Sequence, residues 1–204
     1  MLTDVEREHL FPLALGCPPA VRYQAADGVT PRLQRVLDAM AFTPALVKTA
    51  TWDIVAWNSA AAAVLTDYAQ LEPQKRNVLR LLFLNPGVRA AQVDWESVAR
   101  FVGAVFRAEA ARAGASRAIE VLVDELRLSP EFAALWCDND VETYGGDARH
   151  LHYAELGLIA LEYSAFAVDG QPDLGMVVYN PATPEDAERV RLLIKAKSKE
   201  ESAR

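Results

Sequence analysis

The alternation of hydrophobic and polar positions changes its period along the chain. Between residues 44 and 65, two short alternating stretches flank a turn at 51–53, and a run of small residues follows Asn58. Period-two alternation is typical of half-buried strands, and the side-chain oxygen of Asn58 can accept the free N–H groups of a first helical turn. We therefore predict a β-hairpin, with its second strand at 54–57, that leads directly into a helix capped by Asn58.

The middle of the chain has the helical period instead. Apolar residues recur there at spacings of three and four, which places them on one face of each helix. Cap residues, and prolines at a first helical position, mark where the helices begin. We predict helices that begin at Thr30-Pro31, Asn77, Asp94, Ser116 and Ser129-Pro130, and a turn at Asn85-Pro86-Gly87.

From Arg149 the period returns to two. Strands are predicted near 149–154, 159–165 and 174–179, and Thr183 begins a last helix. None of these strands could bury a face alone, so they must pair with the hairpin. The fold class that we predict is α+β, with a five-stranded antiparallel sheet, helices over one face, extra helices at the N-terminus and an apolar cavity between the layers.

The chain divides into three predicted parts. A first helix ends near Gly16, and Cys17-Pro18-Pro19 makes a stiff connector, so residues 1–29 form a terminal helix and a linker. Residues 30–196 form the predicted domain. Residues 197–204 are predicted to be a solvated tail.

Composition and charge narrow the classes of function. With 204 residues, the chain is long enough for one domain with a sizeable core. A net charge of −7 and a pI of about 5.0 disfavour direct binding to nucleic acid, which needs clustered Lys and Arg. The chain has two cysteines, no signal-peptide pattern and no apolar run of about 20 residues. We expect a cytoplasmic protein without a membrane segment or a disulfide framework.

A metal site is conceivable in one place. His150 and His152 share one face of a predicted strand, and Asp147 is close in sequence. A structural zinc site takes four ligands, but no third His and no nearby Cys completes this set. Strand residues of this kind often face solvent, so we expect neither a metal nor a cofactor.

No catalytic constellation is evident in the sequence. A nucleophilic site would need Ser or Cys near a His and an acid. Cys137 follows Trp136 in an apolar helix, so we expect it to be a buried small side chain. Asp138 and Asp140 lie at a helix end, where solvation explains them. Since G-x-S-x-G, G-x-G-x-x-G and Walker patterns are also absent, we expect that the chain is not an enzyme.

A series of short motifs carries a resemblance to a known family. They are L-T-D-V-E-R-E-H-L-F at 2–11, P-A-L-V at 44–47, D-I-V-A-W-N-S-A-A at 53–61, R-N-V-L-R-L-L-F at 76–83, N-P-G-V-R at 85–89, D-W-E at 94–96, L-V-D-E-L at 122–126, S-P-E-F-A-A-L-W at 129–136 and H-Y-A-E-L-G at 152–157. In this order they resemble the C-terminal ligand-binding domain of MmyB-like transcription regulators, which carry an Xre-type helix-turn-helix at the N-terminus. The resemblance implies a PAS-like fold, a small hydrophobic ligand of the fatty-acid class, and transcriptional control through an attached DNA-binding domain.

The sequence departs from the family pattern in two respects. Tyr153-Ala154 stands where the family has a proline after the histidine, so the local turn is expected to differ. A helix-turn-helix pattern is also absent, and a segment like residues 2–14 is the tail of that domain in the family. We therefore expect DNA contact only through a helix-turn-helix domain that is not present in this chain.

The leading hypothesis is a sensor domain of a transcription regulator that binds a fatty acid and forms a homodimer. The alternative is a PAS-like interaction module whose cavity is filled by its own side chains, without a ligand. Arg76 or Arg89 is the expected head-group contact, and a structural ion pair with Asp94 or Glu96 is the competing interpretation. The full set of expected ligand contacts is Val47, Trp57, Arg76, Phe83, Arg89, Trp95, Val98, Leu161, Tyr163 and Tyr179.

Overall fold

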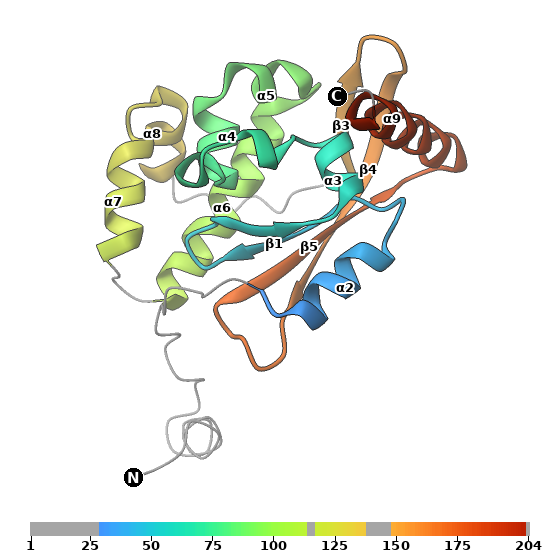
Figure 1. Cartoon of the computed structure of the whole chain (residues 1–204). Coiled ribbons are helices and arrows are strands. Elements are labelled where there is room, and N and C mark those ends of the chain that lie inside the picture. Colours follow the sequence, from blue (N-terminus) through green and yellow to red (C-terminus); the bar gives the residue numbers. More distant parts are fainter. Residues whose placement is uncertain (1–28, 114–116, 138–147, 203–204) are drawn as a thin grey trace.

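The structure is a computed structural model that describes residues 29–113, 117–137 and 148–202 (Figure 1). The predictions for residues 1–28, and those for Asp138, Asp140 and Asp147, lie outside the described residues. The elements in chain order are α2 (Pro31–Ala39), β1 (Ala45–Thr49), β2 (Ile54–Trp57), α3 (Ser59–Val64), the 3₁₀ turns Tyr68–Gln70 and Pro73–Lys75, α4 (Val78–Leu84), α5 (Pro86–Ala91), α6 (Trp95–Ala113), α7 (Arg117–Leu126), α8 (Pro130–Cys137), β3 (Ala148–Tyr153), β4 (Gly157–Ala167), β5 (Leu174–Pro181) and α9 (Pro184–Ser202).

The strands form one five-stranded sheet in the order β2-β1-β5-β4-β3, with every neighbouring pair antiparallel. The C-terminal strand β5 lies in the centre, between β1 of the opening hairpin and β4. In the register, Leu46 pairs with Val177, and Tyr163 pairs with Tyr179. The predicted fold class, an α+β arrangement with a PAS-like antiparallel sheet, is confirmed.

Helices cover both faces of the sheet rather than one. Helix α2 lies on one side, and α4, α5 and α6 lie on the other (Figure 1). Leu37 of α2 is fully buried against Val47 and Val178, which point to the α2 side. The expectation of helices over one face was therefore wrong, because the apolar side chains of β1 alternate between two buried faces rather than between a core and solvent.

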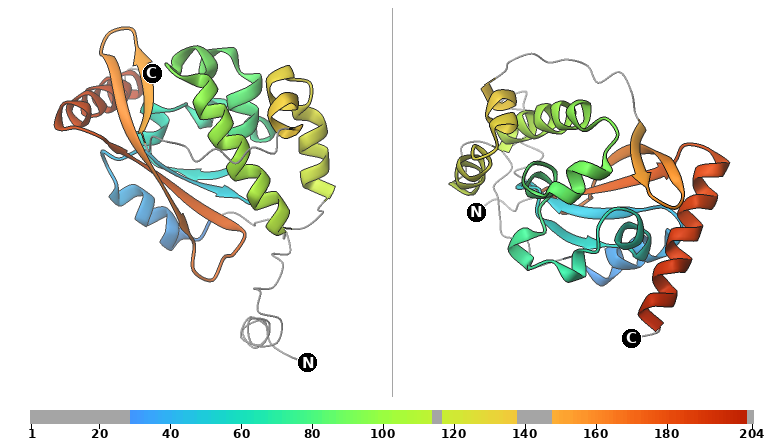
Figure 2. Two further views of the ribbon diagram at one scale, coloured as in Figure 1. Left: turned by 180° about the vertical axis from the view of Figure 1, so that it is seen from behind. Right: turned by 90° about the horizontal axis from the view of Figure 1, so that it is seen from above.

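The helices on the other side form a layer with a core of its own. Figure 2 shows α6 running across the strands, with α7 and α8 farther out. Phe106 of α6 and Phe132 of α8 are almost fully buried in this helical core. The indole of Trp95 donates a hydrogen bond to the carbonyl oxygen of Leu82 at 3.0 Å, which joins α6 to α4. The layer is thus held together by its own buried core and by a hydrogen bond between two of its helices.

Asn58 is the N-cap of α3, as predicted. Its side-chain oxygen accepts hydrogen bonds from the N–H groups of Ala61 and Ala45, at 2.8 and 3.0 Å. Its amide nitrogen donates to the carbonyl oxygens of Met40 and Thr43, both at 2.8 Å. The residue is 2% exposed, so one buried amide connects the end of α2 to β1 and to α3.

The predicted turn at Asn85-Pro86-Gly87 is instead the start of α5. The side-chain oxygen of Asn85 accepts hydrogen bonds from the N–H groups of Gly87 and Val88, at 2.9 and 3.2 Å. A capping Asn followed by Pro at the first helical position begins a helix as readily as it makes a turn. Helix α5 covers one end of the sheet, where it contacts β3.

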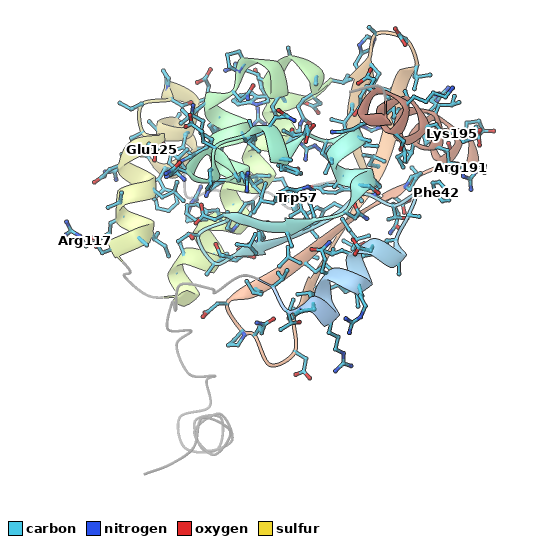
Figure 3. The ribbon with its side chains drawn as sticks, in the orientation of Figure 1. Phe42, Trp57, Arg117, Glu125, Arg191 and Lys195 are labelled. Carbon is cyan, nitrogen blue, oxygen red and sulfur yellow. The ribbon has the colours of Figure 1, made fainter. Side chains whose placement is uncertain are left out.

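Helix α9 packs against α3 and against the ends of β4 and β5, and its Val190 is fully buried. Arg191 of α9 lies over the ring of Phe42, with the guanidinium carbon 5.4 Å from the ring centroid (Figure 3). Among the described helices, none combines the length and the apolar character needed to span a membrane.

Candidate ligand-binding pocket

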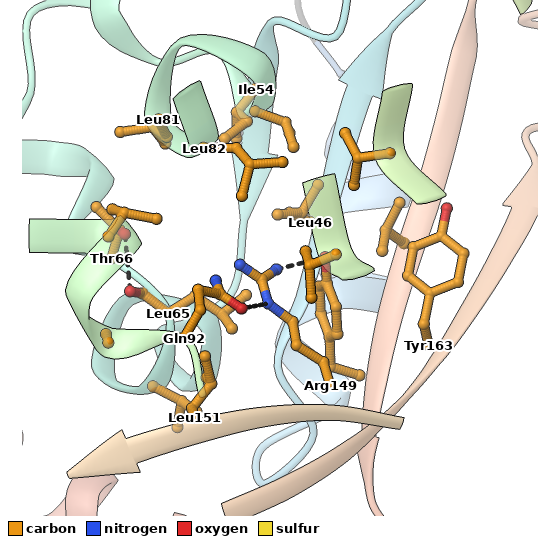
Figure 4. Close-up of a pocket in the computed structure, with 18 of the residues that line it drawn as sticks. Leu46, Ile54, Leu65, Thr66, Leu81, Leu82, Gln92, Arg149, Leu151 and Tyr163 are labelled. Carbon is orange, nitrogen blue, oxygen red and sulfur yellow. Dashed lines mark hydrogen bonds between the residues drawn. The ribbon is translucent and has the colours of Figure 1, made fainter. Parts of the chain in front are cut away.

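A pocket of about 100 Å³ lies between the sheet and the helices α4, α5 and α6 (Figure 4). Its lining is mostly apolar, with side chains from the sheet below and from the helices above. The sheet side includes Leu46, Ile54, Leu151, Tyr163, Val177 and Tyr179, and the helix side includes Leu81, Leu82, Val88, Ala91, Val98, Phe101 and Val102.

The sequence places these side chains in the pocket because inward residues recur every two positions in the strands and every three or four in the helices. On β5, Val177 and Tyr179 are two residues apart and therefore share a face. On α6, Val98, Phe101 and Val102 are three and four residues apart and share a stripe. The pocket is where the tyrosines of the sheet meet this helical stripe.

Arg149 of β3 brings a positive charge into this apolar lining. Its Nε donates to the side-chain oxygen of Gln92 at 3.0 Å (Figure 4). One terminal nitrogen donates to the hydroxyl of Tyr179 at 3.3 Å. Both partners are neutral, and within the described ranges Arg149 forms no ion pair with a carboxylate. The guanidinium therefore keeps an unbalanced charge beside the pocket among the residues described.

Gln92 connects the roof of the pocket to its floor. The residue lies between α5 and α6, is 7% exposed and forms a bridge with Leu151 of β3. The N–H of the next residue, Val93, donates to the carbonyl oxygen of His150 at 3.2 Å. Arg149 is thus oriented by a residue whose backbone is itself anchored to the strand.

Three tyrosines of the lining remain protonated at neutral pH. Burial raises the pKa of the Tyr68 and Tyr163 hydroxyls well above the usual range, and raises the pKa of Tyr153 to about 12. The Tyr153 hydroxyl donates a hydrogen bond to the carbonyl oxygen of Val64. These side chains therefore contribute neutral surface and hydrogen bonds, but no negative charge.

A second cation, Lys48 of β1, borders the opposite end of the pocket. Its Nζ lies 2.8 Å from Oε2 of Glu109 on α6 and 4.0 Å from the centroid of the Trp52 ring. The indole N–H of Trp52 donates to the same carboxylate oxygen at 2.5 Å. The charge of Lys48 is therefore balanced within the protein, unlike that of Arg149.

The structure brings three of the predicted ligand contacts together in the pocket, namely Val98, Tyr163 and Tyr179. Val47 points to the opposite face and packs in the core beside α2. Leu161 is on the pocket side of β4 but is fully buried within the core of that face.

The predicted aromatic contacts from the helices and from β2 lie outside the pocket lining. Phe83 and Trp95 pack edge to face in the helical core, with ring centroids 5.9 Å apart. Trp57 shares a face with its partner Leu46, but its ring packs on Tyr68 at 5.4 Å, at the α3 end of the sheet.

The two predicted head-group arginines also lie outside the lining. Arg76 donates from Nε to the carbonyl oxygen of Leu71 at 3.0 Å. Arg89 pairs with Glu131 at 2.5 Å and lies 4.0 Å above the ring of Trp95. The competing interpretation of Arg89 as a structural ion pair fits this geometry, although the partner is Glu131 rather than Asp94 or Glu96.

Sequence reasoning missed Arg149, Gln92 and Lys48. A usable signal was present for Arg149, because it alternates with His150 and shares a face with Leu151. The candidate ligands predicted on that strand were instead the two histidines, which the register places on the exposed face. Arg149, the inward residue next to Leu151 on the same face of β3, was the informative one.

The remaining candidate chemistry is not assembled into a site. Cys137 is exposed, so its prediction as a buried small side chain was wrong. Within the described ranges, His, Cys, Asp and Glu do not gather in threes that could hold a metal ion.

A PAS-like sheet with a mostly apolar pocket beneath a layer of helices defines a ligand-binding domain as the class of protein. The sequence model of the family described as MmyB-like transcription regulator ligand binding domain matches residues 29–193, so the chain belongs to this family. The predicted resemblance is thereby confirmed, and the family is one of regulator domains rather than of enzymes. A comparison with curated proteins finds no match.

Proposed function

We propose that this domain is the sensor of a cytoplasmic transcription regulator and binds a fatty acid in the pocket between the sheet and α4–α6. The observation that carries the proposal is Arg149, whose hydrogen bonds go to the neutral Gln92 and Tyr179 in an otherwise apolar lining. A buried or half-buried charge is stabilised by an opposite charge, and arginine binds carboxylates through two parallel hydrogen bonds. A fatty acid supplies a carboxylate for Arg149 and an apolar tail for the rest of the lining.

Arg149 replaces Arg76 and Arg89 as the proposed head-group contact. The guanidinium groups of those two residues are engaged with Leu71 and Glu131, outside the pocket lining. Val98, Tyr163 and Tyr179 remain proposed contacts for the apolar tail. Tyr179 has a double role, because its hydroxyl also holds Arg149.

The floor of the pocket offers a route for the signal. Leu46 lines the pocket, and the next residue, Val47, packs against α2 on the other face of β1. A ligand that binds one arrangement of the floor more tightly than another shifts the population toward it. The shift would pass through β1 to α2, and from there to an attached DNA-binding domain.

The alternative function is that of a dimerisation module without a ligand. Exposed apolar side chains support it, including Phe42, which is 49% exposed beside α9. A homodimer is compatible with both functions, so the test must measure the ligand.

The test is native mass spectrometry of the purified protein, followed by displacement of a fluorescent fatty acid. Ala91 lines the pocket, whereas its neighbour Ala90 is exposed and does not. We expect Ala91→Trp to abolish binding and Ala90→Trp to preserve it. A wild-type protein that binds no fatty acid, whether co-purified or added, would support the ligand-free module instead.

A further inference from the structure

A second cavity of about 300 Å³ lies farther along the same face of the sheet. Lys48 and Val177 line both this cavity and the first pocket. On β5, Gly175 of the second cavity lies two residues before Val177 and on the same face. On β4, Ala165 of the second cavity lies two residues after Tyr163 of the first pocket, again on the same face. The two cavities are therefore neighbours over one continuous floor.

The floor of the second cavity is made of small residues. Ala165, Ala167 and Gly175 are on the face that carries Tyr163 and Tyr179 in the first pocket. Ala165 and Ala167 are exposed and Gly175 is half-buried, so these small residues leave open space that aromatic side chains would fill. The second cavity is therefore larger than the first pocket because its floor carries small residues where the first pocket has tyrosines.

The side chain of Lys48 separates the two cavities. Its stem crosses β5 at Gly175, where an added Cβ would come to 3.9 Å from both Cγ and Cε of Lys48. Its ammonium group then reaches Glu109 of α6 at 2.8 Å, and the lysine side chain is only 6% exposed. The ion pair therefore closes the gap between the sheet and α6, with the ring of Trp52 beside it.

The pair lies at the far end of the first pocket from the proposed head-group site. Tyr179, which holds Arg149, and Gly175, which lies under Lys48, are four residues apart on β5, or about 13 Å along the strand. An acyl chain that begins at Arg149 and follows the floor meets Lys48 next.

We propose that the second cavity is a continuation of the ligand site, and that the Lys48–Glu109 pair sets the greatest length of acyl chain that the domain accepts. The inference rests on the proposed function. A tail that ends before the pair leaves it intact. A longer tail must separate the two charges, and leaving the buried Lys48 ammonium without its partner is unfavourable.

The experiment compares a series of saturated straight-chain fatty acids, from octanoate to stearate, in a displacement assay. The double variant Lys48→Ala, Glu109→Ala removes both side chains of the partition. We expect the longest acids to gain roughly tenfold or more in affinity relative to octanoate, because each methylene that enters the second cavity adds apolar burial. The matched control is Glu188→Ala, Arg191→Ala, which removes an exposed pair on α9 and should leave the length profile unchanged.

A third substitution should partly reverse the effect of the double variant. Adding Ala165→Leu to the double variant narrows the second cavity, and should reduce the gain of the longest acids. If the double variant does not show a cooperative melting transition, Lys48→Ala alone replaces it, because Glu109 then keeps the hydrogen bond from Trp52. An unchanged length profile in either folded variant overturns the inference while the proposed function stands. A wild-type protein that binds none of the acids overturns both.

Discussion

The guanidinium of Arg149 donates a hydrogen bond to the hydroxyl of Tyr179, 3.3 Å away, although β4 lies between their two strands. The guanidinium carbon is 5.6 Å from the centroid of the same ring. An arginine that reaches across a neighbouring strand is held over the centre of the sheet rather than at its edge. Arg149 is therefore presented to the pocket in a fixed orientation.

The first prediction concerns this arginine. Arg149→Met should weaken fatty-acid binding roughly 10- to 100-fold, because hydrogen bonds to charged groups contribute about 1.5–3 kcal/mol. Arg149→Lys keeps the positive charge but lacks the planar guanidinium group, so its affinity for the fatty acid should fall between those of wild type and Arg149→Met. Displacement titrations measure all three proteins, with the exposed Arg32→Ala as the control. Equal affinities for Arg149→Met and wild type would remove Arg149 from the head-group site.

The second prediction concerns the buried amide of Asn58. Asn58→Ala should lower the free energy of unfolding by roughly 3 kcal/mol, because several buried backbone groups lose their partner at about 1–3 kcal/mol each. Asn58→Asp should also destabilise, since a carboxylate oxygen would face the carbonyl oxygens of Met40 and Thr43. Urea unfolding measures both variants against Ser59→Ala, an exposed neighbour in α3. A loss as small as that of Ser59→Ala would contradict the connecting role of Asn58.

The third prediction is a dependence of stability on pH. The side chain of Arg80 makes three hydrogen bonds to the carboxylate of Glu125, which joins α4 to α7 and lowers the pKa of Glu125 from its ordinary value of 4.5. A carboxyl whose pKa is lower in the folded state stabilises the protein above the unfolded-state pKa, and this contribution is lost as the pH falls through the folded-state pKa.

Glu125→Gln should therefore cost roughly 1 kcal/mol at neutral pH, a small value because both side chains are partly exposed. The difference from wild type should shrink as the pH falls below 4.5. Urea unfolding at a series of pH values measures it. Glu96→Gln, in an exposed pair with Arg100, is the control and should change stability little at any pH. A difference that grows in acid would reverse the assigned sign.

The fourth prediction concerns the hairpin turn. Trp52 has a φ of 63°, which an L residue adopts at a cost of roughly 1–2 kcal/mol and glycine adopts freely. Its ring is buried against Phe106, so truncation should cost about 3–5 kcal/mol, which exceeds the relief of strain. Trp52→Gly should thus be less stable than wild type but more stable than Trp52→Ala.

Trp95, in the first turn of α6, provides the matched comparison. There the order should be reversed, with Trp95→Ala more stable than Trp95→Gly, because alanine is the better helix former. Thermal unfolding of the four variants tests both orders. If Trp52→Ala were also more stable than Trp52→Gly, the turn conformation of Trp52 would carry no strain.

The order of strands and helices could be predicted from the sequence because local signals agree with the fold. Asn58, Thr30 and Thr183 cap the helices that they were expected to cap, since each cap depends only on residues within the next turn. The period of two after Arg149 likewise depends on burial of alternate residues along one strand. Such signals do not require knowledge of distant contacts.

The pocket could be predicted less well because its lining depends on which face of each strand is inward. Val47 and Leu46 are both buried, so alternation could not distinguish the α2 side from the pocket side. A shift of one residue exchanges the two faces. That Phe83 and Trp95 lie outside the pocket lining could not be predicted for a related reason, since an apolar helix stripe does not reveal whether it packs on the sheet or on another helix.

The central position of β5 also has a consequence for synthesis of the chain. Residues 174–181 lie between β1 and β4, and they are translated after the other four strands that the structure describes and after α4, α5 and α6 of the pocket roof. Until they leave the ribosome, β1 and β4 have no common neighbour, and the apolar floor is incomplete. Long-range strand pairing of this kind is slow to form. A nascent chain therefore completes the floor of the pocket only after residues 174–181 have been synthesised.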